Sequence, residues 1–269
     1  MSLTALAASI TSLPTEGGDT FEPPSPDIFW LPIIGHGDWA ITEQMVWGLV
    51  SVILLSVVMV ALSRRAAVVP SKGQWMLEGF YNFVRNGIAR DMIGTKHFLP
   101  YVPFLFTLFS LILVNNLFGS FFLTMNPTMG RIGFPIALTL LVYVVYHYVG
   151  IKKMGVGGYF KHMVPAGLPG WIVPVIFVLE LITYFITRPL TLALRLFGNM
   201  FAGHMLISLF VGAGAYFLSQ GAVLKALSVP TFMMGGVMLL FELLVQCLQA
   251  YVFTLLAASY IAGAIADDH

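Results

Sequence analysis

Four charged, titratable or amide side chains interrupt the apolar stretch from Thr187 to His204: Arg188, Arg195, Asn199 and His204 itself. A charged side chain at the centre of a bilayer costs about 3 kcal/mol on insertion scales, so a charge inside such a stretch indicates a functional site. Leucines flank Arg195 on both sides, and no acidic residue lies within one helical turn of it. We therefore expect the partner of Arg195 to belong to another subunit.

Helix geometry places the polar residues of this region on different faces. At about 100° per residue, Asn199 falls on the same face as Arg195, whereas His204 points to the opposite face. His204 also lies about 13 Å further along the axis than Arg195, and Glu180 lies about 22 Å in the other direction and about 60° round the helix. In the last apolar stretch, one face carries a polar stripe made of Glu242, Gln246, Gln249 and Tyr260.

These residues indicate proton handling rather than bond chemistry. Burial can tune histidine and glutamate to titrate near neutral pH, whereas arginine keeps its proton and so blocks a relay. We therefore expect two half-paths, one on each side of Arg195, that cannot leak straight through. A structural pair of His204 and Glu242 between packed helices is the alternative. An HExxH pattern is absent and the histidines are scattered, so we expect no metal site and no cofactor.

Other polar residues within the apolar stretches have simpler interpretations. His147 stands just before the inner end of its stretch among three tyrosines, and we expect it to lie at the membrane interface. We expect Arg188 either to extend its long side chain toward the inner membrane surface or to cover packed side chains. Close helix packing explains three glycines: Gly203, Gly212 and Gly214.

The composition is that of a helical integral membrane protein. The chain has 269 residues, of which 58% are hydrophobic and 9% charged, whereas a soluble domain carries about 25% charged residues. The alternating pattern of an outer-membrane barrel is absent. A net charge of +1 gives no reason to expect nucleic acid as a partner, and a phosphate-binding loop is absent, so we expect no direct nucleotide binding. The one cysteine, Cys247, excludes an intrachain disulfide.

Apolar stretches and their boundaries divide the chain into six segments. We expect an acidic external N-terminal tail and lead-in (1–41), without a signal peptide, and a first transmembrane helix (42–65). An amphipathic helix on the membrane surface and its connection follow (66–98), then the second and third transmembrane helices (99–150). An internal loop (151–170) leads to two over-long apolar stretches (171–269).

The first over-long stretch poses a choice of topology. As one helix from Trp171 to Leu218, it would be roughly 70 Å long, against a hydrocarbon core of about 30 Å. It either folds back near Pro189 as two ordinary spans or runs as one steeply tilted helix, and hydropathy alone does not decide. The last stretch, from Pro230 to Ile265, poses the same choice.

The distribution of basic residues predicts the orientation. If the N-terminus is outside and the long fifth stretch crosses once, the outer loops hold only Arg131 and Lys225. The inner segments then hold Arg64, Arg65, Lys72, Arg85, Arg90, Lys96, Lys152, Lys153 and Lys161. The excess of positive charge inside predicts five crossings, with the N-terminus outside and the C-terminus in the cytoplasm.

Several motifs resemble subunit a of the rotary F-type ATP synthase, in its bacterial type. The most specific is Leu194-Arg-Leu-Phe-Gly-Asn-Met-Phe-Ala-Gly-His204. The others are Pro70-x-Lys72-x-Gln74 with Glu78 and Tyr81, Asn116-Leu-Phe-Gly119, and Leu248-Gln-Ala-Tyr-Val-Phe253. The likeness covers nearly the whole chain. It implies an all-α membrane protein with five transmembrane helices and one surface amphipathic helix, whose last two spans (171–269) form a long tilted hairpin around a ring of c subunits.

The resemblance also implies roles for individual residues. Arg195 corresponds to the essential arginine that faces the ring carboxylate, with Asn199 one turn on. The outer half-channel would comprise Asn116, His204, Glu242 and Gln249, and the inner half-channel Glu180 and Tyr260. In some bacterial members the acid and the histidine of the outer pair are exchanged, and Gly119 stands where some relatives have an aspartate. Glu180 is one residue further from Arg195 than in several relatives, which implies a local helix bulge or a shifted role.

The function implied is that of a stator proton channel without catalytic chemistry of its own. Protons would pass through two offset half-channels to and from the ring, coupling the proton gradient to rotation and ATP synthesis. The expected partners are the c ring, the peripheral-stalk b-type subunits and membrane lipid, in the bacterial plasma membrane. The rival classes are a proton-coupled secondary transporter, which would need a substrate cavity, and a membrane-embedded hydrolase, which would need a nucleophile–base pair or a metal.

Overall fold

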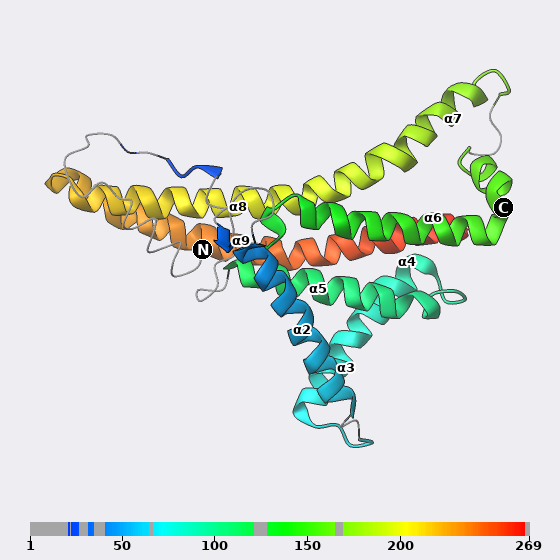
Figure 1. Ribbon diagram of the computed structural model, residues 1–269, viewed down its shortest axis with the longest axis horizontal. Coiled ribbons are helices and arrows are strands. Elements are labelled where there is room, and N and C mark those ends of the chain that lie inside the picture. The colour runs from blue at the N-terminus through cyan, green and yellow to red at the C-terminus, as the bar shows by residue number, and fades with distance from the viewer. Residues whose placement is uncertain are drawn as a thin grey trace. The chain divides into compact units, whose positions relative to one another are not determined.

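The computed structural model describes residues 21, 23–26, 32–34, 41–64, 67–120, 128–164 and 169–266. Among these residues, five helical stretches are long and apolar enough to cross a membrane (Figure 1). They are Glu43–Ala61, Leu99–Ser120, Gly133–His162, Val173–Ser219 and Ala222–Ile265. The prediction of an all-α membrane protein with five spans is confirmed. Most of the expected N-terminal tail (1–41) lies outside the described residues.

The chain divides into two compact units, each treated by itself below. Unit one takes its described residues from Met1–Val57, Leu111–Arg131 and Phe197–Ala250. Unit two takes its described residues from Val58–Ser110, Ile132–Leu196 and Tyr251–His269. In unit one, a small antiparallel ribbon of β1 (Pro32–Ile34) and β2 (Ile41–Thr42) precedes α2 (Glu43–Arg64).

The expected amphipathic segment is helical in unit two. It comprises α3 (Lys72–Val84), the π-helical η2 (Arg85–Arg90) and α4 (Asp91–Ile93). Ser71 caps α3 because its hydroxyl accepts a hydrogen bond from the Gln74 amide. The Gln74 side chain also pairs with both backbone groups of Ala67 and donates to Glu78 at 2.7 Å. The residues of this sequence motif therefore fix the entry into α3.

The helix of the third span continues beyond the predicted end of that span. The second span consists of η3 (Leu99–Tyr101) and α5 (Val102–Ser120), and the third is α6 (Gly133–His162). The sequence predicts an internal loop from residue 151, but α6 continues through Lys152 and Lys153. The interruption comes at Gly155, whose φ of 72° is a left-handed conformation that favours glycine. Charge can mark the end of a membrane segment without ending the helix.

The fifth apolar stretch does not fold back at Pro189. It runs from α7 (Val173–Ile182) through the π-helical η5 (Thr183–Thr187) into α8 (Arg188–Ser219), and Figure 1 shows one continuous helical path. Inside an α-helix, proline removes one backbone hydrogen bond and clashes with the carbonyl group four residues earlier. That carbonyl belongs to Phe185 in η5, where the wider π-turn relieves the clash. Of the two predicted topologies, the continuous helix is the one observed.

The last span is longer than predicted. Helix α9 runs from Ala222 to Ile265, so it starts about two turns before the expected boundary at Pro230. Two hydroxyl groups bond to backbone oxygens beside the proline: Ser228 donates to Lys225 at 2.7 Å, and Thr231 donates to Leu227 at 2.7 Å. Such side-chain bonds help membrane helices to tolerate proline in their interior.

In unit one, α8 and α9 lie side by side (Figure 1). Gly214 on α8 faces the ring of Phe232, since a Cβ atom there would approach the ring to 3.0 Å. Gly203 on the same helix faces Glu242 in the same way. For these two glycines, the expectation of close helix packing agrees with the structure.

Candidate functional site

A buried hydrogen-bonded pair of titratable side chains joins α8 to α9 in unit one. His204 Nδ1 lies 2.8 Å from Glu242 Oε1, and the two residues are only 8% and 4% exposed. Gln246 donates from Nε2 to the same oxygen at 3.0 Å. The second carboxylate oxygen, Oε2, is buried and has no hydrogen-bond partner in the described part of the chain. A buried oxygen without a partner is a suitable place for a proton or a water molecule.

Gln246 connects this pair to the predicted residue Asn116 on α5. Its backbone oxygen accepts a hydrogen bond from Asn116 Nδ2 at 3.1 Å, and its side-chain oxygen accepts one from the Ser120 hydroxyl at 2.8 Å. Gln246 belongs to the polar stripe of the last apolar stretch but is not among the predicted site residues. The available signal was its position one helical turn after Glu242.

A second polar contact joins the same two helices. Asn199 Nδ2 donates to Gln249 Oε1 at 2.8 Å. Gln249 is buried and Asn199 exposed. Unit one therefore brings together five of the eight predicted site residues in two hydrogen-bonded groups: Asn116, His204 and Glu242 in one, and Asn199 and Gln249 in the other.

The absence of a side chain at residue 203 makes room for Glu242. A Cβ atom on Gly203 would lie 2.8 Å from the carboxyl carbon of Glu242, whereas one on Gly198 would meet nothing within 4 Å. Overpacking of this kind costs about 1–3 kcal/mol. We expect Gly203→Ala to lower the thermal stability of the assembled complex and its proton pumping, and Gly198→Ala to change neither. Melting curves and pumping assays on both variants would measure this, and equal behaviour would contradict it.

Arg195 presents its side chain at the surface of unit two. It is exposed, whereas its neighbours Leu192 and Leu196 are 2% and 0% exposed. Its guanidinium group makes no hydrogen bond or ion pair with any residue that the structure describes. An exposed arginine on an apolar helix needs a partner of opposite charge or water. The expectation that its partner lies outside this chain remains a prediction.

Tyr260 lies in a separate cluster within unit two. The guanidinium carbon of Arg188 is 3.5 Å from the centre of the Tyr184 ring and 5.2 Å from that of Tyr260. The Tyr260 ring lies 5.7 Å from that of Tyr146, whose hydroxyl donates to the Tyr184 backbone oxygen at 2.8 Å. Arg188 therefore packs over aromatic rings, which fits the second of its two expected roles, a packing contact, better than extension toward the membrane surface.

His147 is buried within unit two, which its position in the sequence did not indicate; its expected place at the membrane interface remains a prediction. It is 8% exposed. The residues after Gly155 lie against it, and the Tyr159 hydroxyl is 2.8 Å from His147 Nδ1. This burial depends on a reversal of the chain near the end of α6, which the position of His147 in its apolar stretch does not reveal.

Glu180 is half-buried on α7. The π-helical η5 lies between it and Arg195. A π-bulge accommodates one additional residue without breaking a helix. Of the two alternatives for the extra residue in the spacing between Glu180 and Arg195, a bulge or a shifted role, the π-helical segment is consistent with the bulge; the role of Glu180 remains a prediction. The structure places Glu180 in no hydrogen-bonded group with the other predicted residues.

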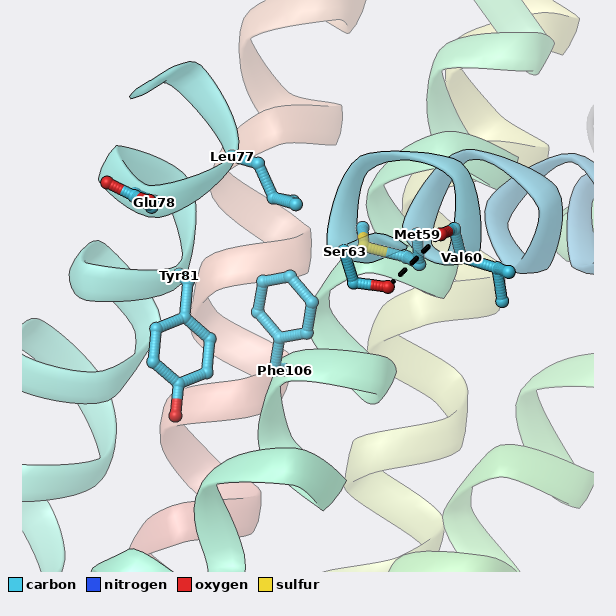
Figure 2. Close-up of a pocket in the computed structure, with 7 residues that line it drawn as sticks. All are labelled: Met59, Val60, Ser63, Leu77, Glu78, Tyr81 and Phe106. Atoms are coloured by element: carbon cyan, nitrogen blue, oxygen red, sulfur yellow. Dashed lines mark hydrogen bonds between the residues drawn. The ribbon is translucent and has the colours of Figure 1, made fainter. Parts of the chain in front are cut away.

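An apolar recess in unit two contains none of the predicted site residues. It has a volume of about 330 Å³ and lies among α2, α3 and α5. Figure 2 shows its lining residues Met59, Val60, Ser63, Leu77, Glu78, Tyr81 and Phe106. Within the described residues, no group of three or more His, Cys, Asp or Glu side chains could hold a metal ion.

Known proteins resemble this chain over nearly all of its length. The family model of the ATP synthase A chain matches residues 45–262. ATP synthase subunit a of a Nocardioides species is 44% identical over 276 residues, covering 98% of this chain and 99% of the relative. The corresponding proteins of Pseudarthrobacter chlorophenolicus and Rhodococcus erythropolis are 40% and 38% identical, each covering 96% of this chain, and this chain covers 98% and 96% of theirs.

Five apolar helices, three of which bury ionisable side chains (His147 on α6, His204 on α8 and Glu242 on α9), define a multi-pass membrane protein. The chain belongs to the ATP synthase subunit a family, and its relatives are bacterial. It is therefore a component of the membrane sector of an ATP synthase complex.

Proposed function

We propose that this chain is the stationary proton-channel subunit of that membrane sector. Protons pass through two offset half-channels to and from carboxylates on a ring of c subunits, and their flow couples the proton gradient to rotation and ATP synthesis. The observation that carries the proposal is the buried network of His204, Glu242 and Gln246, together with an exposed arginine that has no hydrogen-bonded or ionic partner in the described chain. The buried network supplies groups that can exchange protons. The arginine supplies a fixed positive charge that protons cannot cross.

The outer half-channel uses the network in unit one. A proton enters from outside past Asn116, is exchanged at the pair of His204 and Glu242, and leaves toward the ring near Gln249. The unpartnered Oε2 of Glu242 supports this role because it provides a buried acceptor. After it accepts the proton, a ring carboxylate is neutral and can turn into lipid without the desolvation cost of a charge.

Arg195 separates the two half-channels. Its guanidinium group stays protonated, so it attracts an ionised ring carboxylate and does not relay protons. The attraction must not trap the rotor: at 4 Å a unit pair is worth about 4 kcal/mol at an effective dielectric constant of 20, against about 20 kcal/mol in a dry interior. The exposure of Arg195 supports a hydrated contact with the ring.

The inner half-channel begins where the ring carboxylate loses its proton near Arg195. We assign Glu180 and Tyr260 to this path. Support comes from the half-buried position of Glu180 and from the polar aromatic cluster that holds Tyr260. The role of Glu180 rests on its place on the helical path that leads through η5 to Arg195.

The proposal includes the surroundings of the chain. The N-terminus lies outside and the C-terminus in the cytoplasm of a bacterial plasma membrane, with the amphipathic helix α3 at the inner surface. The c ring, the peripheral-stalk b-type subunits and lipid are the partners. The spacing of basic residues supports this orientation. The chemistry of ATP takes place in other subunits.

Cysteine cross-linking tests whether the Arg195 face meets the ring. Thr191 is exposed one turn before Arg195, whereas the adjacent Leu192 is buried at 2% exposure. In a Cys247→Ser background, we expect Thr191→Cys to form a disulfide with a cysteine placed beside the ring carboxylate, and Leu192→Cys to form none. Non-reducing gels measure the yield. Equal yields, or no disulfide at Thr191→Cys, would contradict a ring-facing surface.

A further inference from the structure

The end of α6 folds back onto its own helix in unit two. Gly155 reverses the chain with a φ of 72°, and Tyr159 then lies against Gly150. A Cβ atom on Gly150 would come within 2.4 Å of the Tyr159 ring, so the contact requires glycine there. Two glycines thus allow one tyrosine to reach the body of α6.

The residue that Tyr159 reaches is His147. The Tyr159 hydroxyl lies 2.8 Å from His147 Nδ1, and the two residues are 2% and 8% exposed. Phe185 lies with its ring centre 4.8 Å from that of the imidazole. On α6 itself, the rings of Tyr143 and Tyr146 lie 4.2 Å and 4.3 Å from the imidazole. The histidine is therefore enclosed by aromatic rings and held by one hydrogen bond.

The other ring nitrogen of His147 lacks a hydrogen-bond partner in the described part of the chain. Nε2 is buried and makes no hydrogen bond within the described residues. In one tautomer Nε2 carries a proton that it can donate, and in the other it carries a lone pair that can accept a hydrogen bond. In either tautomer, Nε2 therefore needs a hydrogen-bond partner. Buried polar atoms in proteins are nearly always paired, with protein or with ordered water.

Ring contacts connect the imidazole of His147 with the proposed inner path. Tyr146, in ring contact with His147, is also in contact with Tyr260, and Arg188 lies over the Tyr260 ring. We propose that Nε2 of His147 binds a buried water molecule of the inner half-channel, so that His147 is a positioning residue for proton movement there. The inference rests on the proposed function and adds a residue to it. Tyr159 then serves to fix the imidazole so that Nε2 faces the water.

Two amide substitutions separate this role from a purely structural one. The amide of Gln reaches the place of Nε2, whereas the amide of Asn reaches the place of Nδ1. If Nε2 holds a water molecule of the path, His147→Gln should pump protons within about twofold of the parent and His147→Asn about fivefold more slowly or worse. If His147 only anchors Tyr159, the Asn variant should be the active one, and Tyr159→Phe should lose as much activity as His147→Gln.

The measurements are ATP-driven acidification of inverted vesicles, and passive proton conductance after the catalytic head is removed, on the full complex at equal assembly. The inference predicts that both rates fall in His147→Asn and that both persist in His147→Gln and, to a lesser extent, in Tyr159→Phe. Equal rates in the two His147 variants, or a larger loss in the Gln variant, would overturn it. These outcomes leave the stator role intact, because that role is tested independently at Arg195.

Discussion

Arg195→Ala is expected to abolish ATP-driven proton pumping while the complex still assembles. A guanidinium–carboxylate contact at 4 Å is worth about 4 kcal/mol at an effective dielectric constant of 20, which corresponds to about a thousandfold in rate. The arginine is exposed and makes no hydrogen bond or ion pair with other described residues, so its removal should leave the fold of unit two unchanged. Acidification of inverted vesicles measures the loss.

Two further variants give this prediction its controls. Arg195→Lys keeps the charge but loses the planar fork that suits a carboxylate, so we expect intermediate pumping. Leu190→Ala shortens an exposed side chain on the same helix, 52% exposed, and should leave pumping within about twofold. Normal pumping by Arg195→Ala, or a loss of equal size in Leu190→Ala, would refute a specific role for the guanidinium group.

The second large effect is expected at the buried pair of unit one. Removal of one partner from a buried ion pair costs about 3–5 kcal/mol, because it leaves a charge or a polar group unsatisfied. In Glu242→Ala both His204 and Gln246 lose the oxygen to which they bond. We therefore expect proton pumping and passive conductance to fall together by about 10–100-fold. Both rates should be normalised to the amount of chain that co-purifies with the complex.

Exchanging His204 and Glu242 tests whether the two side chains act as a pair or each act separately. The double variant His204→Glu with Glu242→His restores one acid and one imidazole at 2.8 Å spacing or close to it. Each single exchange should be inactive, and the double exchange should recover at least about tenfold over either one. A double variant no better than the single variants would show that the two positions are not interchangeable, against the outer half-channel assigned here.

The spans and the polar stripe could be predicted because both follow from local pattern. Hydropathy located the five spans, and helical spacing placed Glu242, Gln246 and Gln249 on one face, where the structure buries all three. The first and last residues of the helices were harder to predict from the sequence. Passage of a helix through Pro189 depends on a π-turn, and α6 continues past its lysine pair, so composition alone misplaces the boundary.

Long-range contacts were the part that local pattern could not supply. The burial of His147 requires a glycine with positive φ and a tyrosine twelve residues away that packs against another glycine. The stacking of Arg188 on Tyr260 joins α8 to α9. Such contacts depend on the tertiary arrangement, whereas the resemblance to a family only indicated which residues to consider.

Passive proton conductance of vesicles stripped of the catalytic head tests the central claim most directly. If Arg195 separates two half-channels, Arg195→Ala vesicles should leak protons at least as fast as the parent, although they cannot pump. Adding Glu242→Ala to that variant should stop the leak, because it closes the outer half. A leak that survives the double substitution, or Arg195→Ala vesicles that pump normally, would contradict two half-channels divided by a fixed charge.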